Sequence, residues 1–288
     1  VSKLANVASM ESHGVEFTLS TRNISTKNFK WTTDFIFSNA KNKVTELKSD
    51  ANVMSMISGS GFALEGNPVR SLYSLNFQGL NKEGLPTFNE KGELTVTDIN
   101  FQERENKSHL VYEGSTDPTI TGSFGNIFSY KGFKLNVFMT YSFGNVIRLD
   151  PVFHNAYSDL DATPREFKNR WTVAGDEKIT TVPVIADLRQ NTMNSYLNKA
   201  YNAYNYSTER IAKGDFIRMK EISVTYEFPK TMVSKLSLSN LSLKIQGTNL
   251  FLLYADKKLN GQDPEFFNSG GVAVPVPKQF TLTLRLGI

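Results

Sequence analysis

Alternation of apolar and polar residues is the strongest pattern along the chain. In the segment 133–143 every second residue from Phe133 onward is apolar, and the residues between them are polar except for Phe138. The last seven residues, 282–288, repeat the pattern. A period of two residues is typical of a β-strand with one apolar and one polar face. The two faces of these strands are therefore expected to meet different surroundings.

Similar stretches predict about seven strands, several of them near the roughly 9–11 residues that cross a bilayer. They lie at 15–21, 29–37, 120–130, 133–143, 222–228, 241–251 and 282–288. Between Arg218 and Ile222 the alternation breaks, because Ile217 and Met219 have the opposite parity from Ile222 and Val224. One extra residue in the strand restores the parity, so we expect a β-bulge there.

The connections between these strands alternate between short and long. Short ones lie near 24–28, 130–133 and 229–240, and long ones follow Asn39, Phe143 and Leu253. Long irregular loops are uncommon in compact soluble domains, whereas outer-membrane barrels have short periplasmic turns and long extracellular loops. The rhythm predicts an all-β fold, an antiparallel transmembrane β-barrel whose long loops lie outside the cell.

Aromatic residues flank the short connections. They are Tyr130, Phe133, Tyr226 and Phe228. Aromatic girdles lie at the membrane interfaces of such barrels, which agrees with this topology.

Two helices are expected within the long loops. Thr163 and Glu166, with Pro164 between them, have the form of a capping box and predict a short helix through about Trp171. A second helical stretch is expected around 187–199.

Composition removes several function classes. The chain has no cysteine, which excludes disulfides, thiolate zinc sites and cysteine nucleophiles. Its 32 basic and 28 acidic residues are dispersed, so the net charge of +4 indicates a solvated surface and no nucleic-acid partner. The longest apolar run, 250–255, is too short for a membrane helix. Because the sequence opens with neither Met nor a leader, we expect a processed product or a fragment.

No catalytic, metal or cofactor site is expected. His13, His109 and His154 are isolated and lack the spacing of metal ligands. Asp159-Leu-Asp161 has the start of a calcium loop, but Pro164 and Arg170 replace the required Gly and Glu. We therefore expect the protein not to be an enzyme.

Several motifs occur in the order that one family shows. They are Gly14-Val-Glu16, Asn169-Arg-Trp-Thr172 with Gly175-Asp176, Gly214-Asp-Phe-Ile-Arg-Met-Lys-Glu-Ile-Ser-Val-Thr-Tyr226, Pro229, Gly247-Thr-Asn-Leu-Phe251, Asp263-Pro-Glu265 and Gly270-Gly271. Together they resemble the C-terminal half of SusC/RagA-type TonB-dependent receptors. One departure is the end of the chain at Gly287-Ile288, where members commonly finish on Phe.

The resemblance implies that residues 1–288 form the C-terminal part of a barrel of roughly 22 strands. The family's plug domain, TonB box and earlier strands are absent from this sequence. It further implies active import of glycans or peptides across the outer membrane. The implied partners are a SusD-like surface lipoprotein, membrane lipid and the TonB complex, which acts through the plug.

Aromatic residues of the predicted loops are the candidate ligand contacts, because flat rings stack on sugars and peptide side chains. They are Tyr73, Trp171, Tyr196, Tyr201, Tyr204 and Tyr206. The alternatives are packing within the loops or a contact with the lipoprotein, where such residues are also enriched. Arg218 and Lys220 are expected either to face the lumen or to be ordinary strand residues near the rim.

Two other classes remain open. A soluble all-β module that binds carbohydrate or peptide also alternates apolar and polar residues, but it would bury Leu135, Val137 and Met139 against a second sheet. A passive porin would lack a plug domain.

Overall fold

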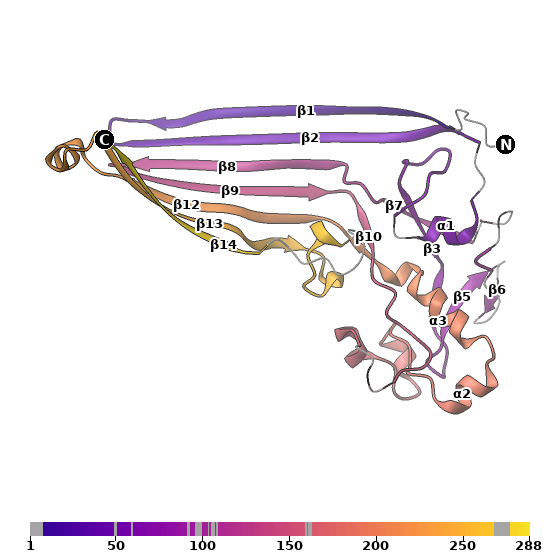
Figure 1. Ribbon diagram of the computed structural model, residues 1–288. Coiled ribbons are helices and arrows are strands. Elements are labelled where there is room, and N and C mark those ends of the chain that lie inside the picture. The colour runs from indigo at the N-terminus through magenta and orange to yellow at the C-terminus, as the bar shows by residue number, and fades with distance from the viewer. Residues whose placement is uncertain are drawn as a thin grey trace, which may run out of the picture.

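The protein has two parts, a sheet of long strands and a unit of short elements at one end of it (Figure 1). The computed structural model describes residues 8–48, 51–58, 60–90, 93–95, 100–102, 104, 107, 109–158, 160, 163–267 and 277–288. The long strands are β1 (Ala8–Ser25), β2 (Phe29–Leu47), β8 (Ile120–Tyr130), β9 (Phe133–Phe143), β12 (Phe216–Glu227), β13 (Asn240–Ala255) and β14 (Gln279–Gly287).

The seven long strands form one sheet in sequence order. Each strand is antiparallel to its neighbours, with the order β1-β2-β8-β9-β12-β13-β14. Each of the predicted strands matches one of these seven, although the predicted ranges 222–228 and 282–288 run one residue past the ends of β12 and β14. An up-and-down sheet of this kind follows directly from hairpin connections between consecutive strands.

Short and long connections lie at opposite ends of the sheet (Figure 1). We call these the turn end and the loop end. The β8–β9 connection consists of Lys131 and Gly132, whose φ angles of 45° and 88° are those of a tight hairpin turn. The β12–β13 connection carries the short helices α4 (Lys230–Val233) and η4 (Ser234–Leu236). The predicted alternation of short and long connections is therefore confirmed.

The register places the apolar residues of neighbouring strands on one face. Val137 on β9 pairs with Ile222 on β12, and Leu243 on β13 pairs with Leu284 on β14. This apolar face is open, since Leu284 is 60% exposed. The polar residues between them form the opposite, polar face. A soluble sandwich would bury the apolar face, so its exposure favours a membrane environment.

The predicted bulge in β12 is confirmed. Met219 pairs with Met139 and Glu221 with Phe138, so Lys220 is the extra residue. The bulge returns Ile217 and Met219 to the apolar face. On β13 the register shifts at the same level, where Asn249 has a left-handed φ of 51°.

On the apolar face the ring of Tyr141 crosses β8 above Gly122. Its hydroxyl donates to the carbonyl oxygen of Ile36 on β2, at 2.8 Å. A Cβ atom on Gly122 would lie 2.3 Å from the Oη of Tyr141. Only glycine leaves room for this bridge between strands that are not neighbours.

The unit at the loop end, which we call the loop unit, comprises the described residues of 51–118 and 144–213. Its elements are α1 (Val53–Ile57), β3 (Ser71–Leu75), β4 (Phe77–Leu80), β5 (Pro86–Glu90), β6 (Glu93–Thr95), β7 (Leu110–Ser115), β10 (Val146–Arg148), η1 (Arg165–Asn169), η2 (Asp176–Lys178), α2 (Leu188–Met193), α3 (Leu197–Asn205), η3 (Thr208–Arg210) and β11 (Ile211–Lys213). Three small sheets, β3-β7, β4-β5-β6 and β10-β11, connect them. After β13 come η5 (Lys257–Leu259) and η6 (Pro264–Phe266).

The apolar core of the protein lies in the loop unit. Its main cluster includes Leu75, Phe88, Phe153 and Tyr204, each at most 2% exposed. Long strands contribute none of the fully buried members of this cluster. The loops therefore form a folded unit with its own core.

The first predicted helix differs in type and in cap. Residues 165–169 form a 3-10 helix, and its N-cap is Pro164 without a side-chain hydrogen bond. The prediction that Thr163 forms a capping box was wrong, because the helix starts one residue later. The second predicted stretch contains α2 and the start of α3, with Asp187 and Gln190 forming a capping box at 2.6 and 3.0 Å. None of the described helices is long and apolar enough to cross a membrane.

Candidate functional site

The six candidate aromatic residues all belong to the loop unit, but they do not share one surface. Tyr73, Tyr201 and Tyr204 are buried, with at most 3% exposure. Trp171 and Tyr206 are half-buried, and Tyr196 is 52% exposed. The structure therefore separates a packed set from an accessible set.

Tyr201 and Tyr204 lie on the inner side of α3. Tyr204 packs edge-on against Phe77 and Phe153, with ring centroids 5.4 and 5.0 Å away. The Tyr201 hydroxyl donates to the carbonyl oxygen of Val184. Burial raises the pKa of both phenols above the usual range for tyrosine, so both stay neutral. Their position favours the packing alternative over ligand contact.

Tyr73 is held similarly, but its cross-strand partner Tyr112 is accessible. The Tyr73 hydroxyl accepts from Nδ2 of Asn67 at 2.8 Å, and burial raises its pKa. Tyr112 on β7 lies 5.7 Å from it, ring to ring, and is 44% exposed. A cavity of about 370 Å³ lies beside Tyr112, lined also by Asn42 and Asp117. Tyr112 was not among the predicted contacts, because it stands in a run of three apolar residues, 110–112, that does not mark it as exposed.

Trp171 is fixed within the Arg-Trp-Thr motif. Its ring packs on Gly84, where a Cβ atom would lie 2.5 Å from the ring and where φ is +77°. Its Nε1 donates to Glu177 at 3.2 Å. Backbone N–H groups of Glu177 itself and of Gly175, together with this indole, hold the pKa of the Glu177 carboxyl below its usual range.

Gly175 and Asp176 of the same motif close the turn. One oxygen of Asp176 accepts from the backbone N–H and the hydroxyl of Thr172, both at 2.9 Å, and from the N–H of Val173 at 3.0 Å. The Thr172 and Val173 N–H groups lower the pKa of this carboxyl. The motif is therefore a self-capped turn, beside a cavity of about 670 Å³ lined by Arg170, Lys178 and others.

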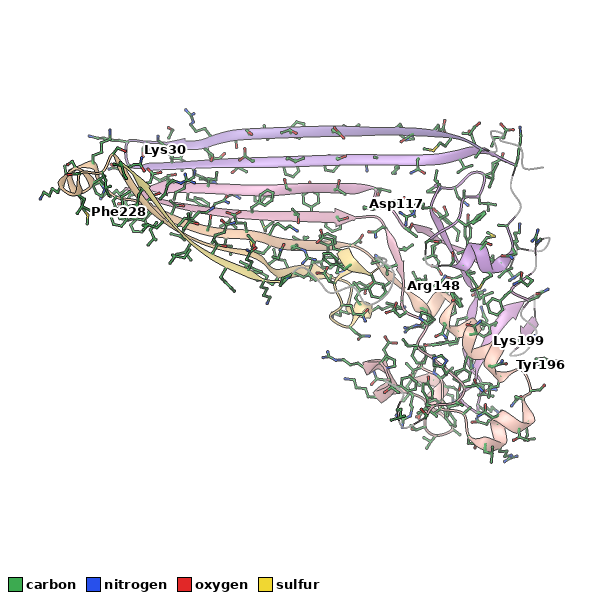
Figure 2. The ribbon with its side chains drawn as sticks, in the orientation of Figure 1. Lys30, Asp117, Arg148, Tyr196, Lys199 and Phe228 are labelled. Atoms are coloured by element: carbon green, nitrogen blue, oxygen red, sulfur yellow. The ribbon has the colours of Figure 1, made fainter. Side chains whose placement is uncertain are left out.

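Tyr196 is the most accessible of the six. It lies at the outer edge of the loop unit, and the Nζ of Lys199 lies 4.7 Å from its ring centroid (Figure 2). Tyr206, near Tyr196 in sequence, is instead covered by Phe101 and by the guanidinium of Arg148 at 5.7 Å. Tyr196 is therefore the best placed of the predicted contacts for an external partner.

Arg148 on β10 connects three separate segments of the loop unit. Its Nε donates to the carbonyl of Ile57 at 3.1 Å and its Nη1 to that of Ser207 at 3.1 Å. Its Nη2 donates to the carbonyl of Tyr73 and to the hydroxyl of Ser74. Burial lowers the pKa of Arg148 to about 10, which leaves it charged at neutral pH. Sequence reasoning missed this residue.

The polar face of the sheet carries a hydrogen-bonded network near the turn end. Glu221 accepts from Nδ2 of Asn136 at 3.0 Å and from the hydroxyl of Ser223 at 2.9 Å, and Nζ of Lys244 lies 3.5 Å away. Lys134 and others line a cavity of about 320 Å³ beside them. Charged and hydrogen-bonded side chains are unfavourable against lipid, so this face is suited to an aqueous interior.

The described residues include no group of three His, Asp or Glu side chains that would hold a metal ion. Asp159 and Asp161, considered above as a calcium loop, lie outside the described residues, as do Gly270 and Gly271.

Comparisons with known proteins agree with the motifs. No family model matches the sequence. TonB-dependent receptor P3 of Formosa agariphila is 25% identical over 280 residues, covering 92% of this chain and 26% of the relative. TonB-dependent receptor P39 of the same organism is 25% identical over 342 residues, covering 99% and 31%. The resemblance to TonB-dependent receptors is thereby confirmed, and the chain spans under a third of the length of these relatives.

A solved structure shows the same fold. The RagAB peptide transporter matches with a TM-score of 0.73 at 22% identity, covering 98% of this chain and 30% of that one. The predicted likeness to the SusC/RagA type therefore holds at the level of the fold.

Proposed function

We propose that this chain, a relative of TonB-dependent receptors, is the C-terminal part of the wall of an outer-membrane import barrel. The observation that carries the proposal is the pair of faces on the seven-stranded sheet. The apolar face is open to its surroundings, while the polar face holds a network of paired charges. Such a sheet is stable where one side meets lipid and the other meets water.

The wall needs further strands to close. β1 and β14 lie at the edges of the described sheet, and unpaired edges are not tolerated in lipid. We propose that residues 1–288 form the C-terminal part of a barrel of roughly 22 strands. The other strands would come from elsewhere in the protein, and a separate plug domain would fill the lumen. With the turn end in the periplasm, the loop unit lies outside the cell.

The proposed activity is import of large nutrients, driven by the proton-motive force through TonB. The RagAB structure is that of a peptide transporter, which supports a peptide cargo, and the exposed aromatics Tyr112 and Tyr196 suit sugars equally well. The proposed partners are a SusD-like lipoprotein at the loop unit, the TonB complex at the plug, and membrane lipid. We expect neither an enzymatic activity nor a nucleic-acid partner.

The soluble binding module is the second candidate. It would need a layer covering Leu284 and its neighbours, and these side chains are exposed in the described part of the chain. The importer is therefore the better account.

Uptake by cells that produce the full-length receptor tests the proposal. Fluorescent peptide mixtures and fluorescent oligosaccharides serve as the probes, with and without a protonophore and in a strain lacking TonB. We expect one probe class to accumulate only in energised cells with TonB. Equal accumulation without TonB would indicate a passive porin, and absence of the receptor from the outer membrane would refute the proposal.

A further inference from the structure

The segment 256–267, which we call the strap, folds back from β13 onto the loop unit. Asp256 accepts from the N–H of Lys213 at 2.8 Å, and Nδ2 of Asn260 donates to Glu166 at 2.6 Å. Leu259 is 1% exposed and packs with Ile147 and Leu149. One side of the strap is therefore attached to the loop unit.

The other side of the strap is attached to the inner wall of the sheet through Arg218. This residue pairs with Thr140 in register and so lies on the polar face, where it is 5% exposed. Its Nη2 forms an ion pair with Asp263, and its Nε lies 2.9 Å from Oε2 of Glu265. Both carboxylates belong to η6 or its cap, so one buried cation holds the end of the strap.

The bulge in β12 explains why Arg218 lies on the polar face. In a regular strand Arg218 and Glu221 would face opposite sides, but the bulge at Lys220 places both on the polar face. Lys220 itself approaches Glu265, at 4.0 Å. The strand motif and the Asp-Pro-Glu motif, far apart in sequence, thus form one contact.

The orientation of the carboxylates is also fixed locally. Asp263 caps η6 by accepting from the N–H of Glu265 at 3.1 Å, and Pro264 between them is buried. A buried guanidinium without its carboxylates is strongly unfavourable, so the cation and the strap stabilise each other's position.

We propose that Arg218 is a positioning residue that latches the strap across the loop-end opening of the barrel, so that the strap narrows the entrance. This inference rests on the proposed barrel. Release of the latch would lift η6 from the sheet while the loop unit keeps its core.

Cysteine labelling in the full-length receptor tests the latch, because this chain has no cysteine of its own. Pro264→Cys reports lifting of η6, since this position lies between the two carboxylates that Arg218 holds and its side chain is buried. A membrane-impermeant maleimide is added to intact cells, and the labelled peptide is identified by mass spectrometry. We expect Arg218→Gln, added to Pro264→Cys, to raise the labelling rate at position 264 by about tenfold, as a local opening equilibrium would.

Lys244→Gln is the matched control, because it removes a different ion pair on the same polar face, with Glu221. It is expected to leave the labelling rate unchanged, while Asp263→Asn is expected to raise it as Arg218→Gln does. An unchanged rate in Arg218→Gln, or the same rise in Lys244→Gln, overturns the latch.

A second measurement tests whether the strap narrows the entrance. If Arg218 only stabilised the fold, its substitution would not change the size of molecule that passes. Thr121 is an exposed residue of the polar face near the loop end of β8. For Thr121→Cys we expect a polymer-linked maleimide to react more slowly than a small one, and Arg218→Gln to reduce that difference. If the difference between the two reagents is the same with and without Arg218→Gln, the strap does not narrow the entrance. Labelling at position 121 only after cell lysis would instead contradict the proposed orientation in the membrane.

Discussion

Apolar side chains are exposed on the sheet but buried in the loop unit. On the sheet, Phe280 and Leu284 are 75% and 60% exposed, whereas in the loop unit Phe153 and Leu75 are at most 2% exposed. A unit surrounded by water must bury its apolar side chains within itself. A sheet that leaves them open across seven strands is stable only beside another apolar phase, and we propose that lipid is that phase. The loop unit therefore has the burial pattern of a protein in water, and the sheet has the pattern expected beside an apolar phase.

Tyr204→Ala is expected to have the largest effect, and only on the loop unit. It removes a buried ring that packs on Phe77 and Phe153, which typically costs about 3–5 kcal/mol. Hydrogen exchange of the α3 peptide in the full-length receptor across a denaturant series, read by mass spectrometry, measures the loss. Tyr196→Ala, at an exposed position, is the control and should unfold like the parent. Equal effects of the two variants would mean that α3 does not pack as described.

Ile245→Arg tests the other region. A charge on the lipid-facing side of a barrel costs about 2–4 kcal/mol near mid-depth, so folding into lipid should weaken by that order. Gln246→Arg on the polar face is the matched control and should cost little. The measurement is the folded fraction in lipid across a urea series, read from heat-modifiable gel mobility. If Gln246→Arg proved the more harmful, the two faces would be assigned the wrong way round.

Gly122→Ala is expected to cost about 1–3 kcal/mol through overpacking. The added Cβ would displace the Tyr141 ring and its hydrogen bond to Ile36. The same urea series measures the loss. Gly66→Ala, a glycine of positive φ with open space around it, separates backbone strain from the steric contact. A cost no larger at Gly122 than at Gly66 would argue against the Tyr141 bridge.

The smallest expected effect is a pH-dependent change around Trp171. The pKa of Glu177 is lower in the folded turn than the ordinary 4.5. The ionised carboxylate therefore stabilises the turn above pH 4.5, and this stabilisation is lost as the pH falls through the pKa of the folded state. Emission from Trp171 should therefore hold steady at neutral pH and change in that acidic range. Glu177→Gln should remove this step. A step that persists in this variant would assign the change to another group.

The strands were predictable from sequence because successive residues of a strand face opposite sides of the sheet, so apolar and polar residues alternate. The bulge at Lys220 was predictable for the same reason, since it appears as a break in parity. Tyr201 and Tyr204 carried a signal that was not used: Leu197, Ala200, Tyr201 and Tyr204 follow helical spacing on one face of α3. Their burial could therefore have been predicted.

Arg148 could not have been predicted. Its acceptors are backbone carbonyls of Ile57, Tyr73 and Ser207, and a carbonyl is present at every position of a sequence. The pairing of Arg218 with Asp263 was hidden for a related reason, because two motifs were visible but nothing in either one indicated the other.

Quenching at adjacent positions of β14 tests the central claim that the apolar face meets lipid. Leu284→Cys and Thr283→Cys variants of the full-length receptor, labelled with an environment-sensitive fluorophore and placed in lipid, are exposed to brominated lipid and to aqueous iodide. We predict quenching by brominated lipid at position 284 and by iodide at position 283. Quenching of both positions by iodide alone would contradict the account.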